Sequence, residues 1–583
     1  MFADLSVGGI IIANVIGGRR PQTGRGPLLE RDVLAYSGMT RRRFLRLAGL
    51  ATAGMVTGVR GAARAAGAKA PALGRPNVVF IMADDWGFGD VKCFGKERCR
   101  ISTPHMDTLA AKGMRFLDAH SSSAVCTPTR YGILTGRYNW RSRLKSSVLM
   151  GFSPHLIEDG RETVASFLKK NGYATGCVGK WHVGMDMQTV DGKPPRARLT
   201  SKDRDKPLSG DKCNVDWKAP IRNAPTSFGF DYYYGIAASL DMPPYIWIHN
   251  DRFVGECTTV KAFHRNGPAH KDFFDYDVLP TIARKACDFV ERQAKGDKPF
   301  FLYVALNAPH TPISPSKEFR GKSGLGRYAD FVMETDWAVG QVVKAIDQAG
   351  LADNTLIIAT ADNGCSPAAA NRGVMGSLNI TFNGAESKPA EPGRHYSCGI
   401  YRGHKADIYE GGHRIPFIAR WVGKVKASSA CNDTTCLIDL YATCAEILGK
   451  AIPDNAAEDS VSMLPNLLGT ATGPVREATV HHSINGSFSI RQGKWKLEFC
   501  PGSGGWSAPR PGSKEALAGP SHQLYDLSKD SGENKNLYTD EHPAARKLTM
   551  LMKKYISDGR STPGKPQKNT GKTSLYLRGR RKR

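Results

Sequence analysis

Four short apolar runs, three of them followed directly by polar residues, predict buried strands in this chain. The runs do not alternate between apolar and polar positions, which is typical of strands covered on both faces of a parallel sheet. The four runs are Asn77–Met82, before Ala83-Asp84-Asp85; Pro299–Leu306, before Asn307-Ala308-Pro309-His310; Thr355–Thr360, before Asp362-Asn363-Gly364; and Ile415–Trp421.

Amphipathic segments between these runs predict helices. In the clearest one, Tyr328–Ala349, apolar residues recur mostly three or four positions apart, and Gly350 follows as a common helix stop. Shorter helices are predicted at 104–114, 162–171 and 437–448. Strands that alternate with helices predict an α/β fold with a large, mostly parallel sheet flanked by helices. Ligands bind such sheets beyond the carboxyl ends of the strands, where the polar residues lie.

The pattern changes after about Pro474. Residues 479–496 are rich in β-formers and turn residues, and a helix is predicted near 544–555. We therefore expect a catalytic domain over 66–474 and a C-terminal subdomain over 475–560, a smaller antiparallel sheet with a helix. The Lys/Arg/Gly-rich residues 561–583 predict a basic disordered tail.

The front of the chain is typical of an export signal. Thr40–Arg46 reads Thr-Arg-Arg-Arg-Phe-Leu-Arg, a weakly apolar stretch follows to Val59, and Ala63-Arg64-Ala65 forms a small-x-small cleavage pattern. This resembles a twin-arginine (Tat) signal, with Met39 as the expected start of translation. Residues 1–65 are therefore read as an N-terminal extension and signal peptide. The Tat translocase is the expected partner, and the expected location is periplasmic or secreted.

Charge and cysteine content add two expectations. Over 583 residues, 81 Lys+Arg against 54 Asp+Glu give a net charge of +27, and both ends of the chain are strongly basic. No nucleic-acid-binding fold or aromatic–basic interleaving accompanies this charge, so no nucleic-acid partner is expected. An oxidising compartment would permit disulfides such as Cys93–Cys99 or Cys431–Cys436, although the count of thirteen cysteines leaves one over.

One cysteine stands at a point that favours an anion. Cys126-Thr127-Pro128-Thr129-Arg130 opens a predicted helix, and a helix N-terminus with an arginine one turn later attracts negative charge. A buried structural cysteine is the ordinary alternative. However, the segment Cys126–Gly136 is similar to the signature of the type I, formylglycine-dependent sulfatases: C-x-P-x-R, then T-G.

The resemblance covers roughly residues 76–540 and is greatest to exported bacterial enzymes of the arylsulfatase and N-acetylgalactosamine-6-sulfatase type. It implies an alkaline-phosphatase-like sandwich fold. It also implies that Cys126 is oxidised to formylglycine by a formylglycine-generating or anaerobic sulfatase-maturing enzyme. One Ca²⁺ per chain is implied as cofactor, beside residue 126. The metal-binding residues implied are Asp84, Asp85, Cys126, Asp362 and Asn363.

The remaining family motifs follow in order and imply the catalytic residues. Lys180 and His182 belong to a G-K-W-H segment, His310 matches a pocket histidine, and Lys405 lies in a G-x-K-x-x-x-Y-E-G-G segment. Together with Cys126 and Arg130, these four residues form the expected catalytic set.

The family mechanism gives each of these residues a role. A hydroxyl of the formylglycine hydrate at residue 126, activated by Ca²⁺ and Asp362, attacks sulfur. The charges of Arg130, Lys180 and Lys405 balance the sulfate. His310, helped by Lys405, protonates the leaving alcohol. His182 takes a proton from the second hydroxyl, which expels sulfate.

The substrate is not specified by these motifs beyond a sulfated carbohydrate or an aryl sulfate. Loop residues such as Trp247, Arg372 and His404 are candidate sugar contacts, although ordinary loop packing explains each of them as well. Two alternative functions also fit parts of the pattern. One is a phosphate or phosphonate ester hydrolase of the same superfamily, and the other is a sulfated-glycan-binding protein that is never oxidised at Cys126.

Overall fold

A ten-stranded mixed sheet forms the centre of the computed structural model, which describes residues 73–381 and 390–575. Its middle strands are parallel neighbours, and within the sheet β14 and β6 run against the others. In spatial order the strands are β15 (Ser429–Cys431), β2 (Met114–Phe116), β14 (Phe417–Arg420), β11 (Thr355–Ala361), β1 (Asn77–Ala83), β10 (Phe300–Ala305), β4 (Ala174–Lys180), β5 (Tyr232–Ile236), β6 (Ile248–His249) and β7 (Arg252–Phe253).

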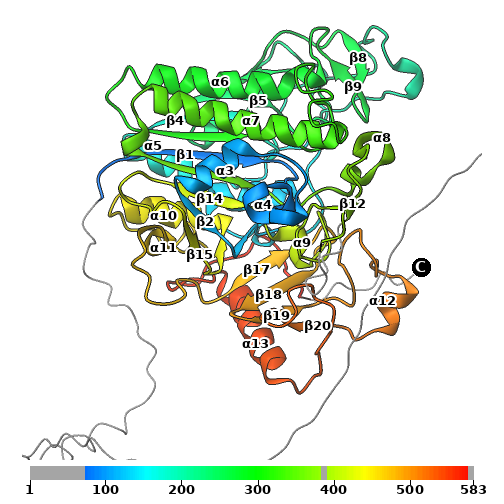
Figure 1. Ribbon diagram of the computed structural model, residues 1–583. Helices are drawn as coiled ribbons and strands as arrows, with labels where there is room; N and C mark the ends of the chain where they lie inside the picture. The colour runs from blue at the N-terminus through cyan, green and yellow to red at the C-terminus, as the bar shows by residue number, and fades with distance from the viewer. Residues whose placement is uncertain (1–72, 382–389, 576–583) are drawn as a thin grey trace, which may run out of the picture. The chain divides into compact units, whose positions relative to one another are not determined.

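Helices cover both faces of this sheet. Every residue of β1, β10 and β11 is buried, as expected for strands packed on two sides. Figure 1 shows α6 and α7 on one side of the strands and α10 and α11 on the other. The larger helices are α3 (Pro104–Ala111), α4 (Cys126–Thr135), α5 (Val164–Lys170), α6 (Val278–Gln293), α7 (Arg327–Gln348), α10 (Leu440–Ile447) and α11 (Leu464–Leu468). The predicted α/β fold class is confirmed.

A smaller antiparallel sheet follows near the C-terminus, also as predicted. Its strands are β17 (Thr479–His482), β18 (Phe488–Gln492), β19 (Trp495–Glu498) and β20 (Gln523–Asp526), and α13 (Pro543–Asp558) packs on it. Tyr138 and Trp140, which follow α4, join its buried core. The small sheet is therefore fastened to the segment that begins at residue 126.

Two expectations differ from the structure. All thirteen cysteines are free, so neither Cys93–Cys99 nor Cys431–Cys436 is a disulfide. The predicted disorder after residue 561 does not hold for its described part, 561–575. There the Lys568 carbonyl accepts from Arg137 Nη2 at 2.7 Å, and the Thr570 N–H donates to the Arg141 carbonyl at 2.6 Å. Both arginine side chains are buried, and Arg141 Nη1 donates to Asn569 Oδ1 at 3.0 Å, so this segment supplies partners to both guanidinium groups.

The predicted signal peptide, residues 1–65, lies outside the described residues. Among the helices that the structure describes, none has the length and apolar character needed to cross a bilayer.

Candidate active site

Four adjacent parallel strands end at one edge of the large sheet and carry most of the predicted site residues. Asp84 and Asp85 follow β1, and Asp362 and Asn363 follow β11. On the other side of β1, β10 leads to His310, and β4 ends in Lys180, two residues before His182. The order β11-β1-β10-β4 therefore brings together side chains that lie far apart in the sequence.

Two glycines allow the strand ends to approach this closely. Gly179 has a φ of +112°, and a Cβ there would lie 1.9 Å from the Ala305 carbonyl oxygen of β10. A Cβ on Gly364 would lie 1.8 Å from the Gly411 carbonyl oxygen. Neither position accepts a side chain without backbone movement.

Cys126 lies at the N-terminus of α4, against the two strand ends that carry Asp84 and Asp362. It is 2% exposed, and its Sγ lies within 4.8 Å of a carboxylate oxygen of each aspartate. Backbone and side-chain contacts from the small sheet fix the approach to it, since the Ala124 N–H and Ser123 Oγ both donate to the His482 carbonyl, at 2.9 and 2.7 Å. Burial raises the pKa of the Cys126 thiol.

Three carboxylates and three cations pair one to one around residue 126. The Lys180 ammonium lies 2.6 Å from Asp84 Oδ2, and that of Lys405 lies 2.7 Å from Asp85 Oδ1. Arg130 donates from Nε and Nη2 to Asp362 Oδ2 at 3.1 and 2.7 Å. These six side chains sum to a net charge of zero, so a divalent cation added here would make the site positive and favour an anionic substrate.

The same carboxylates respond differently to their surroundings. Burial alone would raise the pKa of Asp84, but the adjacent Lys180 and His310 charges outweigh it and lower that pKa well below its usual value. Burial, together with the charge of Asp84, raises the pKa of Asp362 to about 6. Asp84 and Asp362 thus depend on the same neighbouring positive charges. A bound cation would add positive charge and stabilise the ionised form of both carboxylates.

The predicted metal-binding oxygens converge here and fit a hard cation. Oxygen atoms of Asp84 and Asp85 lie within 4.8 Å of each other, as do those of Asp84 and Asp362. Within the described part of the chain, Asp84 Oδ1 and Asn363 Oδ1 are buried and accept no hydrogen bond. Buried acceptor oxygens from carboxylate and amide groups are the ligands that Ca²⁺ prefers.

The two predicted histidines present different nitrogens. His182 Nε2 donates to the Leu149 carbonyl at 2.7 Å, which leaves Nδ1 as an acceptor with no partner among the described residues. Burial lowers the pKa of His182 well below its usual value, so the ring is a neutral base. In His310, Nδ1 donates to the Thr311 carbonyl at 2.6 Å, while Nε2 faces Asp85 Oδ2 at 3.6 Å.

A cavity of about 410 Å³ opens onto this arrangement. Cys126, His310 and Lys405 line it, whereas Arg130 and Lys180 are fully buried behind the carboxylates. The other residues that line the cavity come from loops: Val125, Ser147, Val148, Met150, Asp241, Met242, His264, Arg265, Thr311, Ser366, Pro367, Ala368, Ile484 and Trp506.

Sequence reasoning missed the most informative of these loop residues, Asp241, Arg265 and Trp506. Asp241 lies between β5 and β6, and Trp506 lies between β19 and β20 of the C-terminal subdomain, in a segment whose position no motif indicates. Of the three sugar contacts suggested from the sequence, Trp247 packs against other aromatic rings and His404 bonds to the Lys405 carbonyl at 2.8 Å. The side chain of the third, Arg372, lies outside the described part of the structure.

A second cluster of histidines lies where β17 of the small sheet meets β3 (Ala119–His120) and α9 (Glu410–His413), and it does not fit a metal. The rings of His413 and His481 stack in parallel, with centroids 3.8 Å apart and an angle of 5°. A metal ion lies in the plane of each imidazole that binds it, so two stacked rings cannot share one ion. His120 Nδ1 instead lies 2.9 Å from His413 Nδ1, and His481 Nδ1 donates to the Ser121 carbonyl at 3.1 Å. The cluster joins β17 of the small sheet to β3 and α9.

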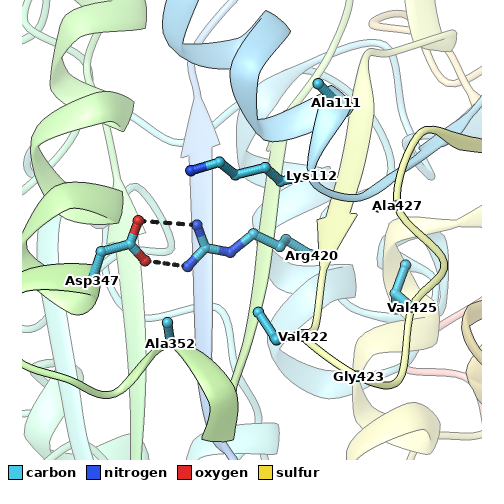
Figure 2. A pocket seen from close by; sticks show the side chains of 9 residues that line it. All are labelled: Ala111, Lys112, Asp347, Ala352, Arg420, Val422, Gly423, Val425 and Ala427. Carbon is cyan, nitrogen blue, oxygen red and sulfur yellow. Dashed lines mark hydrogen bonds and ion pairs between the residues drawn. The ribbon is translucent and has the colours of Figure 1, made fainter.

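Figure 2 shows another cavity, of about 400 Å³, beside the ion pair of Asp347 and Arg420. Arg420 pairs with Ile357 near the start of β11, whereas Asp362 follows the end of that strand. This cavity therefore lies at the opposite edge of the sheet from residue 126.

Known proteins are similar to this chain over most of its length. Residues 76–450 match the family model described as Sulfatase. The N-acetylgalactosamine-6-O-sulfatase of Bacteroides thetaiotaomicron is 32% identical over 522 residues, which cover 82% of this chain and 92% of that protein. Arylsulfatase A of Homo sapiens is 30% identical over 492 residues, with coverage of 79% and 83%. A solved structure from work on the metabolism of multiple glycosaminoglycans by Bacteroides thetaiotaomicron superposes with a TM-score of 0.67 at 30% identity, covering 82% of this chain and 99% of that one.

Proposed function

The chain belongs to the sulfatase family and hydrolyses sulfate esters, and we propose that its substrates are sulfated carbohydrates, cleaved with residue 126 as formylglycine beside one Ca²⁺. The observation that carries this proposal is the position of Cys126, at the floor of a cavity and within 4.8 Å of carboxylate oxygens that are matched by cations. The carbohydrate substrate is supported by the N-acetylgalactosamine-6-O-sulfatase relative.

The residues that line the cavity act on the ester directly. Lys405 holds the sulfate oxygens, because its ammonium lies at the cavity surface beside Asp85. His310 protonates the leaving alcohol through Nε2, the nitrogen not bonded to the Thr311 carbonyl. A bound Ca²⁺ would supply positive charge that makes a hydroxyl at residue 126 more acidic and balances the sulfate.

Three buried residues that do not line the cavity, Arg130, Lys180 and His182, act on groups beneath its surface. Arg130 and Lys180 keep Asp362 and Asp84 ionised and in place through their ion pairs. His182 accepts a proton through its free Nδ1 as sulfate leaves, since its other nitrogen is bonded to the Leu149 carbonyl. A second hydroxyl on residue 126 is the source of that proton. A serine or an unmodified cysteine lacks this second hydroxyl.

Mass spectrometry of the tryptic peptide 116–130 tests the modification. Active enzyme should show formylglycine at residue 126, and Cys126→Ala should abolish turnover while the unfolding temperature stays unchanged. Full activity in a sample that contains only unmodified cysteine would overturn the proposal. Rates on 4-nitrophenyl sulfate that exceed those on 4-nitrophenyl phosphate separate a sulfatase from a phosphate ester hydrolase.

We also propose that the protein is exported by the twin-arginine route after a formylglycine-generating or anaerobic sulfatase-maturing enzyme has acted on Cys126. The Thr40–Arg46 motif supports this. Replacing Arg41 and Arg42 together with lysine should retain active enzyme in the cytoplasm, and unchanged export of that variant would contradict the route.

A further inference from the structure

A β-hairpin presents a charged tip to the wall of the cavity above residue 126. Strands β8 (Thr259–Ala262) and β9 (Asn266–Ala269) pair antiparallel, and the turn between them carries His264 and Arg265, both of which line the cavity. The Tyr245 hydroxyl donates to the Arg265 carbonyl at 2.6 Å, and the Tyr245 ring packs edge-on against Phe263 with centroids 4.7 Å apart. The tip is therefore held in place by packing.

Asp241 lies beside this tip, and only one of its two carboxylate oxygens is hydrogen-bonded among the described residues. It is only 7% exposed, and its Oδ2 accepts from Arg265 Nη1, which also donates to the Asp241 carbonyl at 3.1 Å. Oδ1 is buried and has no hydrogen-bond partner among the described residues. An unpaired buried carboxylate oxygen is costly, so a donor that arrives with the substrate would be favoured.

The surroundings keep Asp241 ionised. Burial alone would raise its pKa, but the charges of His310 and Arg265 outweigh that effect and lower the pKa. An ionised carboxylate only accepts hydrogen bonds. It therefore binds O–H or N–H groups and repels a second sulfate or a carboxylate.

We propose that Asp241 binds a hydroxyl of the sugar whose sulfate is cleaved, and so determines which sulfated sugar this enzyme accepts. The site lies on the leaving-alcohol side, because Asp241 shares the cavity with His310, the proposed acid. Arg265 orients the carboxylate, and the Trp506 ring, 40% exposed at the same cavity, offers an apolar surface for a sugar face. This inference rests on the proposed function, since it concerns the substrate of that site.

The test compares a sugar substrate with one that has no hydroxyl beside the ester. The sugar is the best substrate from a panel of 2-, 4- and 6-sulfated galactose, glucosamine and galactosamine, and the comparison is 4-nitrophenyl sulfate. In Asp241→Ala, the ratio of kcat/KM for the sugar to kcat/KM for the aryl sulfate should fall by about 100-fold. Wild-type enzyme should lose a similar factor on one deoxy analogue of the sugar, and the variant should lose nothing further on that analogue.

Asp297→Ala is the matched control, because Asp297 is exposed and lies before β10, at the other edge of the sheet, and its ratio should match wild type. If Asp241→Ala does not fold, the substrate ratio is measured in Asp241→Asn, and the deoxy analogues are measured with wild-type enzyme. Equal losses on both substrates, or no deoxy analogue that loses activity, would overturn the inference. Wild-type enzyme that cleaves neither substrate would instead overturn the proposed function.

Discussion

His182 and His310 use opposite ring nitrogens in their hydrogen bonds to backbone carbonyls. Their positions follow from the motifs, but their roles depend on which nitrogen is occupied. Leu149, whose carbonyl fixes the ring of His182, belongs to no motif, and the motif around His310 does not indicate that the Thr311 carbonyl fixes that ring. At the scale of single residues, the sequence therefore predicts which side chains gather, and the structure adds their hydrogen-bonding states.

Variants of His182 and His310 should differ in their kinetics. His182→Ala should give a burst of alcohol release and then a slow steady state, because sulfate cannot leave without its base. His310→Ala should give no burst, and its activity should fall more steeply as the pKa of the leaving alcohol rises. Stopped-flow measurement on aryl sulfates of graded leaving-group pKa distinguishes these outcomes, and the reverse pattern would mean that the two roles are exchanged.

The sequence does not predict three residues of the cavity: Asp241, Arg265 and Trp506. Each comes from a different loop, and no spacing rule connects them, because loop conformation depends on packing between distant segments. Tyr245 and Phe263, which hold the hairpin tip, have no recognisable signal in the sequence.

Among the elements, predictability follows the apolar pattern. The strands β1, β10 and β11 are continuous apolar runs and were predicted within a residue or two. Strand β4, with the sequence Ala-Thr-Gly-Cys-Val-Gly-Lys, was missed, because its small residues give no such run. Helix α6 was also missed, although its buried residues recur at helical spacing; Pro280 in its first turn obscures the pattern.

The small residues of β4 lead to a prediction. Gly179→Ala places a Cβ against the Ala305 carbonyl oxygen and imposes a positive φ, so we expect a loss of about 3 kcal/mol in unfolding free energy. Activity should fall as well, because Lys180 is the next residue. Urea unfolding measures the first effect and aryl sulfate turnover the second.

Gly192→Ala separates the cost of crowding against the Ala305 carbonyl oxygen from the cost of the positive φ. Gly192 also has a positive φ, +66°, but a Cβ there meets nothing within 4 Å, so only the backbone strain of about 1 kcal/mol should remain. Equal losses in both variants would show that crowding against β10 contributes nothing.

For the whole molecule, the buried cluster of His120, His413 and His481 makes the contact between the small sheet and the segments β3 and α9 sensitive to acid. Burial lowers the pKa of His120 to about 3 and those of His413 and His481 well below the usual 6.5. Below pH 6.5 the unfolded chain therefore binds protons that the folded chain does not. Stability should fall as the pH falls through this window, by up to about 1.4 kcal/mol per pH unit for each histidine.

His481→Asn tests this pH dependence. Asparagine can still donate to the Ser121 carbonyl but takes up no proton, so the slope of unfolding free energy against pH should be shallower by about 1.4 kcal/mol per unit between pH 6 and pH 4. His249→Asn, at an exposed position, should leave the slope unchanged. A variant slope equal to that of wild type would contradict the assignment of the acid sensitivity to this cluster.

The buried position of Cys126 also bears on the timing of its proposed oxidation. In the folded chain its thiol is 2% exposed, and the Ser123 hydroxyl just before it bonds to the His482 carbonyl, 359 residues later. Until residue 482 has been synthesised, that contact cannot form, so the segment before Cys126 lacks one of the bonds that hold it in the folded chain. At roughly 5–20 residues per second, synthesis of these 359 residues takes on the order of 20–70 s, and we propose that the modifying enzyme acts on Cys126 in this interval.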